Sequence, residues 1–188
     1  VGRVINQDLH GTAIPQMVIV TVPALLAAAN RLASWHQGRD GISSLVVTTN
    51  EVYQEFSGGQ PNPTAIRDMV KMFYDRAGTD SVLRPRYLLL FGDASFDYKN
   101  RLPGNTNLVP AYESRSSLDP LTTYVSDDYY GFLDDTDDIN ALSAGNQLDI
   151  GIGRIPAGTL TAANDYVDKV SLYHQLPARG EWRNELSF

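Results

Sequence analysis

Three short runs of apolar residues constrain the fold more than any other feature of the chain. They occupy residues 17–22 (MVIVTV), 44–49 (SLVVTT) and 87–91 (YLLLF). A run that is apolar throughout, rather than at every second position, predicts a strand covered on both faces. A later run, LDIGIGRIP, predicts a fourth strand at residues 149–153, where glycines indicate close approach of a neighbouring backbone.

Segments with apolar residues at helical spacing lie between these strands and after the last one. They predict helices near residues 24–37, 63–77 and 161–176. Strands that alternate with helices imply a parallel sheet with helices packed on its faces. We therefore expect an α/β protein with three layers, α/β/α, and a mainly parallel sheet. At 188 residues, the chain is long enough for one domain, so residues 1–188 are expected to form a single α/β domain.

One long segment, residues 94–147, interrupts the alternation between the third and fourth strands. Loops longer than about 15 residues are uncommon in compact domains and are usually functional or disordered. This segment is rich in Tyr and Phe, which favours order. Because ligands bind beyond the carboxyl ends of the strands in open α/β sheets, we expect this insertion to face a ligand.

The negative charge of the chain is concentrated in the same region. No Lys or Arg occurs between Ser116 and Gly153, where there are eight aspartates, while elsewhere 14 acidic residues nearly balance 15 basic ones. This distribution argues against a nucleic-acid partner, which requires a basic surface, and favours a cation or a cationic ligand. No apolar run reaches the roughly 18 residues of a transmembrane helix, and the start of the chain lacks the pattern of a signal peptide.

The densest acidic run, DDTDD, raises the question of a metal site. An EF-hand is excluded, because the run lacks the Gly and Glu that such a loop needs at its sixth and twelfth positions. An irregular Ca²⁺ site remains open, with Asp134, Asp135 and Asp137 as candidate ligands. The alternative is a hydrated acidic turn. No other cofactor is expected.

No catalytic residue can be assigned from the residues themselves. The absence of cysteine excludes a cysteine nucleophile within these 188 residues. His10, His36 and His174 have no second histidine at metal-binding spacing, and no GxSxG motif marks a serine nucleophile.

Several segments together resemble the gingipain family of cysteine peptidases, and most closely the gingipain-like sortase of the Bacteroidetes type IX secretion system. In chain order they are VYQEFSGGQPNPTAIRDMVKMFYDRA, RYLLLFGDASFDYKN, LVPAYES, YVSDDYYGFLDD and LDIGIGRIPA. The resemblance runs from Val46 to the end of the chain. It implies a caspase-like module that is secreted or exposed at the cell surface, of which this chain is the amino-terminal subdomain.

The resemblance also implies a division of labour. The catalytic His and Cys lie in a second subdomain outside this chain, so the remainder of the catalytic domain is an expected partner and the chain alone is expected to be inactive. The implied function is that of a cysteine endopeptidase or transpeptidase (sortase) acting on secreted polypeptides, with part of the substrate cleft built by this chain. The alternative is a non-catalytic α/β binding or interaction module.

Two residues of the insertion become candidate substrate contacts by the same resemblance. In Arg-specific gingipains, the segment similar to SDDYYG supplies an aspartate that holds a basic side chain before the scissile bond, and by position that aspartate is Asp127. We expect Asp127 and Asp128 to point in different directions along an extended segment, and Tyr130 to form an apolar wall. The alternative for Asp127 is a loop-anchoring role.

Overall fold

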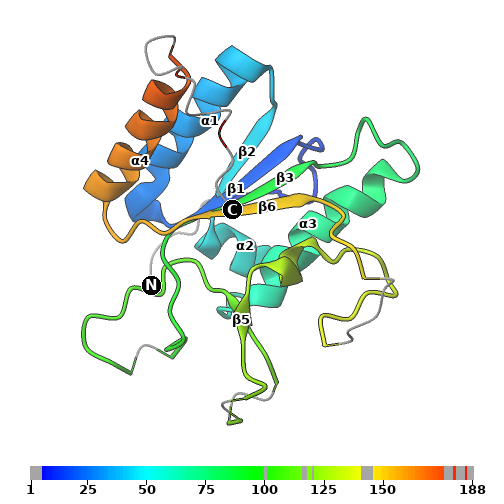
Figure 1. The fold of residues 1–188 in the computed structure, drawn as a ribbon. Coiled ribbons are helices and arrows are strands. Elements are labelled where there is room, and N and C mark those ends of the chain that lie inside the picture. The colour runs from blue at the N-terminus through cyan, green and yellow to red at the C-terminus, as the bar shows by residue number, and fades with distance from the viewer. Residues whose placement is uncertain are drawn as a thin grey trace.

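A computed structural model describes residues 6–99, 101–115, 118–119, 121–140, 146–175, 180 and 185. Its centre is a four-stranded, fully parallel sheet with the strand order β2-β1-β3-β6 (Figure 1). The strands are β1 (Met17–Thr21), β2 (Ser44–Thr48), β3 (Tyr87–Phe91) and β6 (Gly151–Ile155). The parallel sheet is confirmed, and β6 begins two residues later than predicted.

Four α-helices accompany the sheet in the described part of the chain. They are α1 (Leu26–Asp40), α2 (Thr49–Phe56), α3 (Pro63–Ala77) and α4 (Leu160–Tyr173). The sequence pattern predicts all of these except α2. This short helix begins directly after β2 with a capping box, in which the Thr48 side chain accepts from the Glu51 N–H and the Glu51 carboxylate accepts from the Thr48 N–H.

The helices cover both faces of the sheet. Side chains of α2 and α3 pack with Val18, Val20 and Leu90 on one face, whereas α1 and α4 pack with Met17 and Ile19 on the other. All five residues of β1 are buried, which explains why this run is apolar at consecutive positions. Figure 1 shows the two helical layers on opposite sides of the sheet, so the three-layer α/β/α architecture is confirmed.

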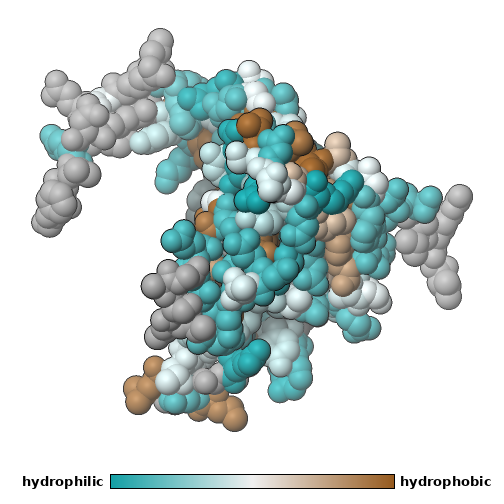
Figure 2. Space-filling model, turned by 90° about the vertical axis from the view of Figure 1, so that its right-hand side faces the viewer, coloured by the Kyte–Doolittle hydropathy of each residue, from teal (hydrophilic) through white to brown (hydrophobic). Residues whose placement is uncertain are grey.

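The insertion between β3 and β6 contains its own small sheet. Strands β4 (Tyr112–Glu113) and β5 (Val125–Ser126) pair antiparallel, and a 3-10 helix (Asp128–Gly131) follows β5. Figure 1 shows this hairpin projecting away from the main sheet. Near its end, Leu118 and Leu121 are 99% and 93% exposed, and Figure 2 shows apolar atoms at the lowest part of the molecule, where the hairpin ends.

None of the helices in the described residues has the length and apolar character needed to cross a membrane.

Candidate functional site

Asp127 forms an ion pair with Arg154 of β6. The Arg154 Nε and Nη2 atoms donate to the two carboxylate oxygens of Asp127, each at 2.7 Å. The same guanidinium donates to the backbone oxygens of Gly92, Val109 and Pro110. A bidentate pair of this kind fixes orientation as well as charge. Both carboxylate oxygens of Asp127 are therefore engaged by a residue of the same chain, and the geometry is that of the loop-anchoring alternative.

The local backbone differs from the expected extended segment. Asp127 has φ −87° and ψ −12°, and it precedes the 3-10 helix that begins at Asp128. The prediction that the two aspartates lie on an extended segment is wrong, because the chain turns here into the 3-10 helix that carries Tyr130 into the core.

The side chain of Tyr130 is completely buried, and its hydroxyl donates to the Pro110 carbonyl oxygen at 2.5 Å. It packs in the core beneath the insertion together with Leu133. A substrate at the surface does not reach a ring with no exposed area. The assignment of Tyr130 as a substrate-binding wall is therefore corrected to a core residue that holds the insertion on the sheet.

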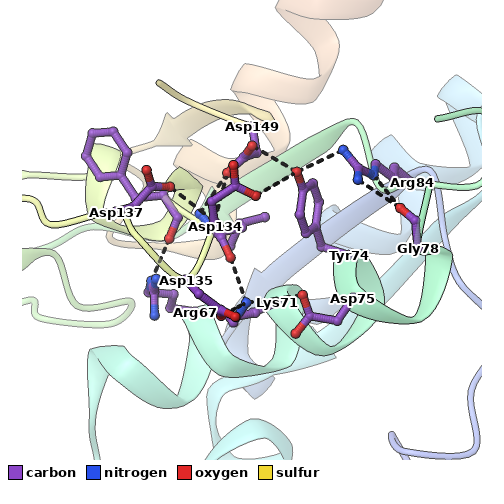
Figure 3. Close-up of polar contacts among 12 residues, drawn as sticks. Arg67, Lys71, Tyr74, Asp75, Gly78, Arg84, Asp134, Asp135, Asp137 and Asp149 are labelled. Atoms are coloured by element: carbon purple, nitrogen blue, oxygen red, sulfur yellow. Dashed lines mark hydrogen bonds and ion pairs between the residues drawn. The ribbon is translucent and has the colours of Figure 1, made fainter. Parts of the chain in front are cut away.

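Residues 132–138, which follow the 3-10 helix and are called the acidic segment here, lie along α3 (Figure 3). Arg67 Nε donates to the Phe132 carbonyl oxygen at 2.8 Å, and Lys71 Nζ donates to the Leu133 carbonyl oxygen at 2.7 Å. Lys71 also pairs with Asp135 at 2.9 Å. Arg67 and Lys71 are four residues apart, so both face the same side of α3 and contact successive residues of the segment.

Asp149 closes the other side of this arrangement. One of its carboxylate oxygens accepts from the Tyr74 hydroxyl at 3.0 Å, and the other accepts from the Leu133 and Asp134 backbone N–H groups. Burial and the hydrogen bond to Asp149 raise the pKa of Tyr74 to about 12, so the hydroxyl keeps its proton and remains a donor. Arg84 stacks on the Tyr74 ring and donates to its oxygen (Figure 3).

The three candidate Ca²⁺ ligands have protein partners in this network. Asp135 pairs with Lys71, Asp137 accepts from the Asp134 N–H at 3.1 Å, and Asp134 lies 3.3 Å from the Tyr74 hydroxyl. Across the residues that the structure describes, no three or more His, Cys, Asp or Glu side chains converge in a group that could hold a metal ion. The calcium site remains a prediction. In the structure, Asp134 and Asp135 contact side chains of α3, and Asp137 accepts a hydrogen bond within the segment.

Two adjoining cavities open beside the insertion. The larger has a volume of about 660 Å³ and lies between the segment that follows β2, the start of α3, and the segment 107–115. The smaller, of about 350 Å³, lies over α3 and the acidic segment. Both are lined by Thr64, Tyr112, Glu113 and Arg115. The larger cavity is thus formed by segments that follow the carboxyl ends of β2 and β3, where open α/β sheets bind ligands.

Stacked aromatic rings and a hydrogen bond support the wall shared by the two cavities. Tyr112 stacks on Tyr129 with ring centroids 4.5 Å apart, and the Tyr129 hydroxyl is hydrogen bonded to Thr64 at 2.8 Å. The guanidinium of Arg67 lies over the Tyr129 ring, 5.6 Å from its centroid. Such a wall presents a fixed surface to a ligand, with little side-chain entropy left to lose on binding.

A model of peptidase family C25 matches residues 11–188 of the chain. The chain belongs to this family, the gingipain peptidases. No curated protein sequence matches it. The chain is similar to a solved structure described as dimeric latent PorU from Porphyromonas gingivalis, with 35% identity and a TM-score of 0.81. That match covers 98% of this chain and 18% of the PorU chain.

Two further solved structures share the fold at lower identity. They are a complex of the RgpB pro- and mature domains from Porphyromonas gingivalis (TM-score 0.51) and the Arg-specific cysteine proteinase gingipain R (TM-score 0.56). Each is 16% identical to this chain, and the matches cover 85% and 91% of it. The chain spans 29% and 31% of those two chains, so it corresponds to a part of each molecule that it matches.

Three residues of this site escaped sequence reasoning. Arg154 belongs to a strand that was predicted from its apolar residues and glycines. An Arg within an otherwise apolar strand is itself a signal of a buried acidic partner. Tyr53, which lines the larger cavity, belongs to α2, the helix that was not predicted. Glu113 belongs to a strand of only two residues, which is too short to show a pattern.

Proposed function

We propose that this chain is the amino-terminal part of a gingipain-like cysteine peptidase or transpeptidase that acts on secreted polypeptides at the cell surface. In this proposal the chain supplies one wall of the substrate cleft, and the nucleophile comes from elsewhere in the full-length protein. Membership of family C25 supports the peptidase class. The absence of cysteine from the 188 residues supports the division of labour.

The observation that carries the proposal is the position of the larger cavity. It is bordered by segments that follow β2 and β3, so it lies beyond the carboxyl edge of the sheet and opens beside the insertion. Its lining combines apolar walls from proline and tyrosine with several polar groups, as is common in ligand sites.

The sequence resemblance to the sortase subgroup favours transfer rather than hydrolysis as the finer assignment within this proposal. In a transferase of this kind, an acyl-enzyme formed on the cysteine is attacked by an amine rather than by water.

We assign Asp127 the anchoring role within this function. Its carboxylate is held by Arg154, and a cationic substrate side chain would have to compete with that intramolecular guanidinium. Asp127 thus acts on the cleft by fixing the start of the 3-10 helix and, through it, the insertion.

The test uses the full-length protein that contains this chain, with a secreted polypeptide as substrate and mass spectrometry of the products. Cleavage or amine transfer that depends on a cysteine outside residues 1–188 is expected. Replacing Tyr98, which lines the larger cavity and is 63% exposed, by Ala is expected to raise KM about 2- to 10-fold, the range for loss of one aromatic contact.

The matched control is Tyr166→Ala, because Tyr166 is 38% exposed on α4, on the other face of the sheet. Its KM should equal that of the wild type. A full-length protein that binds polypeptide but neither cleaves nor transfers it would instead identify a non-catalytic binding module. Equal KM values for the two variants would show that the larger cavity is not part of the substrate cleft.

A further inference from the structure

One carboxylate of α2 ties down the segment that precedes β1. This segment, residues 7–12, is called the strap here. The Glu55 carboxylate accepts from the backbone N–H groups of Leu9 and His10, at 2.8 Å and 3.3 Å, and it lies 2.8 Å from His10 Nδ1. The Gln7 amide donates to the same carboxylate at 2.9 Å. A single glutamate therefore collects hydrogen bonds from three residues of the strap.

Other contacts hold the strap across α2 and α3. Leu9 is buried in the core that α2 and α3 share, and the His10 ring stacks on Phe56 of α2 with centroids 4.7 Å apart. Arg76 of α3 donates to the carbonyl oxygens of His10 and Thr12, at 2.9 Å and 3.3 Å. The strap is thus attached to two helices, mainly by polar contacts that a few side chains provide.

Helix α2 stands between the strap and the larger cavity. Thr49 and Tyr53 line that cavity, whereas Glu55 holds the strap. Two positions on an α-helix are about 200° apart, so Tyr53 and Glu55 lie on nearly opposite sides of α2. The Gln7 amide also donates to the backbone oxygen of Glu51 at 2.7 Å. The helix therefore has the strap behind it and the cavity in front of it.

The position of Tyr53 depends on α2 rather than on the cavity side. Tyr53 is only 8% exposed, and in the part of the chain that the structure describes its hydroxyl makes no hydrogen bond. Its carbonyl oxygen accepts from the N–H groups of Ser57 and Gly59, which closes the turn after α2. That turn leads to residues 61–64, which also line the cavity. A movement of α2 consequently carries two parts of the cavity wall with it.

The contacts of α2 are distributed unevenly along its length. The capping box at Thr48 and Glu51 fixes its first turn, and Val52 is buried in the core. The strap contacts Glu55 and Phe56 in its last turn. A helix of eight residues is too short to be stable on its own, so its position is set by such contacts. Loss of the strap would therefore loosen the carboxyl-terminal half of α2 first.

We propose that the strap regulates the larger cavity through α2. While Glu55 holds the strap, α2 keeps Tyr53 in the cavity wall, and detachment of the strap frees both to move. Attachment of the strap and occupation of the cavity are then linked, and the linkage is reciprocal. A ligand that packs on Tyr53 tightens the strap, and a partner that pulls the strap away weakens that ligand. This inference goes beyond the proposed function, because the coupling operates whether or not the full-length protein turns a substrate over.

Two variants of the full-length protein detach the strap in different ways. Glu55→Gln removes the charge that strengthens the hydrogen bonds from the strap. The double variant Gln7→Ala/Arg76→Met removes other polar attachments and leaves every side chain of α2 unchanged. We expect amide hydrogen exchange in residues 7–12 to become roughly 5- to 30-fold faster in both. Lys169→Met, at an exposed position of α4, is the control and should leave it unchanged.

The state of the cavity wall is measured at Tyr53 without any ligand. Tyrosines are acetylated with N-acetylimidazole near neutral pH, and mass spectrometry of peptides gives the rate for each residue. Burial raises the pKa of Tyr53 to about 12 and shields its hydroxyl, so the wild type should react slowly. We expect roughly 3- to 10-fold faster acetylation of Tyr53 in both strap variants. Tyr130, which is completely buried, reports global unfolding and should stay unreactive, and the exposed Tyr166 calibrates the reagent.

The outcomes distinguish a regulatory strap from a simple tether. Faster exchange in the strap together with faster acetylation of Tyr53 in both variants supports the inference. A response of Tyr53 to Glu55→Gln alone overturns it, because the effect is then local to α2. A detached strap with an unchanged Tyr53 overturns it as well, and so does a strap that exchanges at the wild-type rate in either variant. Coupling in a protein without cleavage or transfer supports this inference and contradicts the proposed enzymatic function, and turnover without coupling does the reverse.

Discussion

The guanidinium of Arg154 and the carboxylate of Asp127 meet through two parallel hydrogen bonds of 2.7 Å, with side chains that are 14% and 25% exposed. Arg154 belongs to the edge strand β6 and Asp127 to the insertion. This pair therefore joins the main sheet to the segment that borders the cavities. Its strength decides how firmly the insertion is held.

Asp127→Asn tests this anchor. The substitution leaves a buried guanidinium without its counter-charge, and we expect the free energy of unfolding to fall by about 2 to 4 kcal/mol, near the lower part of the range for buried pairs because Asp127 is partly exposed. Urea unfolding measures the change. Asp128→Asn, one residue away and exposed, should stay within about 0.5 kcal/mol of the wild type. Similar decreases in the free energy of unfolding for the two variants would contradict the anchoring role of Asp127.

Lys71→Met tests the attachment of the acidic segment to α3. It removes the donor to the Leu133 carbonyl oxygen and the partner of Asp135. We expect a local loss of about 1 to 2 kcal/mol, seen as roughly 5- to 30-fold faster amide hydrogen exchange in residues 132–137. Lys169→Met on α4 is the control and should leave exchange in this segment unchanged. Unaltered exchange in Lys71→Met would mean that Arg67 and Asp149 hold the segment without it.

The hydrogen bonds that Glu55 accepts from residues near the amino-terminal end of the chain predict that the free energy of unfolding depends on pH. Burial opposes its charge, but hydrogen bonds from the Leu9 backbone, His10 and Gln7 outweigh this and hold the pKa of Glu55 below its usual value. A carboxyl group with a lowered folded-state pKa stabilises the fold above the unfolded-state pKa of about 4.3, and this stabilisation is lost as the pH falls through the folded-state pKa.

The measurement is urea unfolding of the wild type and Glu55→Gln between pH 7 and pH 3. We expect the wild type to be more stable at pH 7, and the difference to shrink as the pH falls below about 4.3. Asp165→Asn, at an exposed position of α4, should show no comparable trend. A stability difference that is the same at both ends of the pH range contradicts the prediction.

The calcium hypothesis is tested by thermal unfolding in millimolar Ca²⁺ and in a chelator. The carboxylates of Asp134, Asp135 and Asp137 already lie within reach of protein donors. The predicted Ca²⁺ site requires a melting temperature that rises and saturates with Ca²⁺, because a ligand that binds only the folded state stabilises it. The same melting temperature in the two conditions would contradict the prediction.

The sheet and three of the helices could be predicted because their causes are local. A strand such as β1, buried on both faces, is apolar at each step, and helix α3 has buried residues at helical spacing and a glycine just after its end. Helix α2 was missed although Thr48 and Glu51 stand three residues apart, as a capping box requires. The prediction gave Thr49 to the preceding strand, which hid the start of the helix.

The candidate site could not be predicted to the same extent, because its contacts join residues that are distant in sequence. Asp127 and Arg154 are 27 residues apart, and no residue near Asp127 in the sequence indicates that it pairs with an arginine. The role of Tyr130 was misjudged for a similar reason. The pattern of an aromatic residue in an insertion is compatible with a binding surface and with a core position. Which of the two it takes depends on the residues that pack around it in the folded chain.

Helix α3 holds the acidic segment largely through main-chain atoms. Arg67 and Lys71 bind the carbonyl oxygens of Phe132 and Leu133, which every amino acid possesses. Exposed positions of the segment, such as Asp135 and Thr136, can consequently be exchanged by mutation while these two attachments persist. The path of the segment along α3 is therefore set by two side chains of the helix and not by the identity of its own exposed residues.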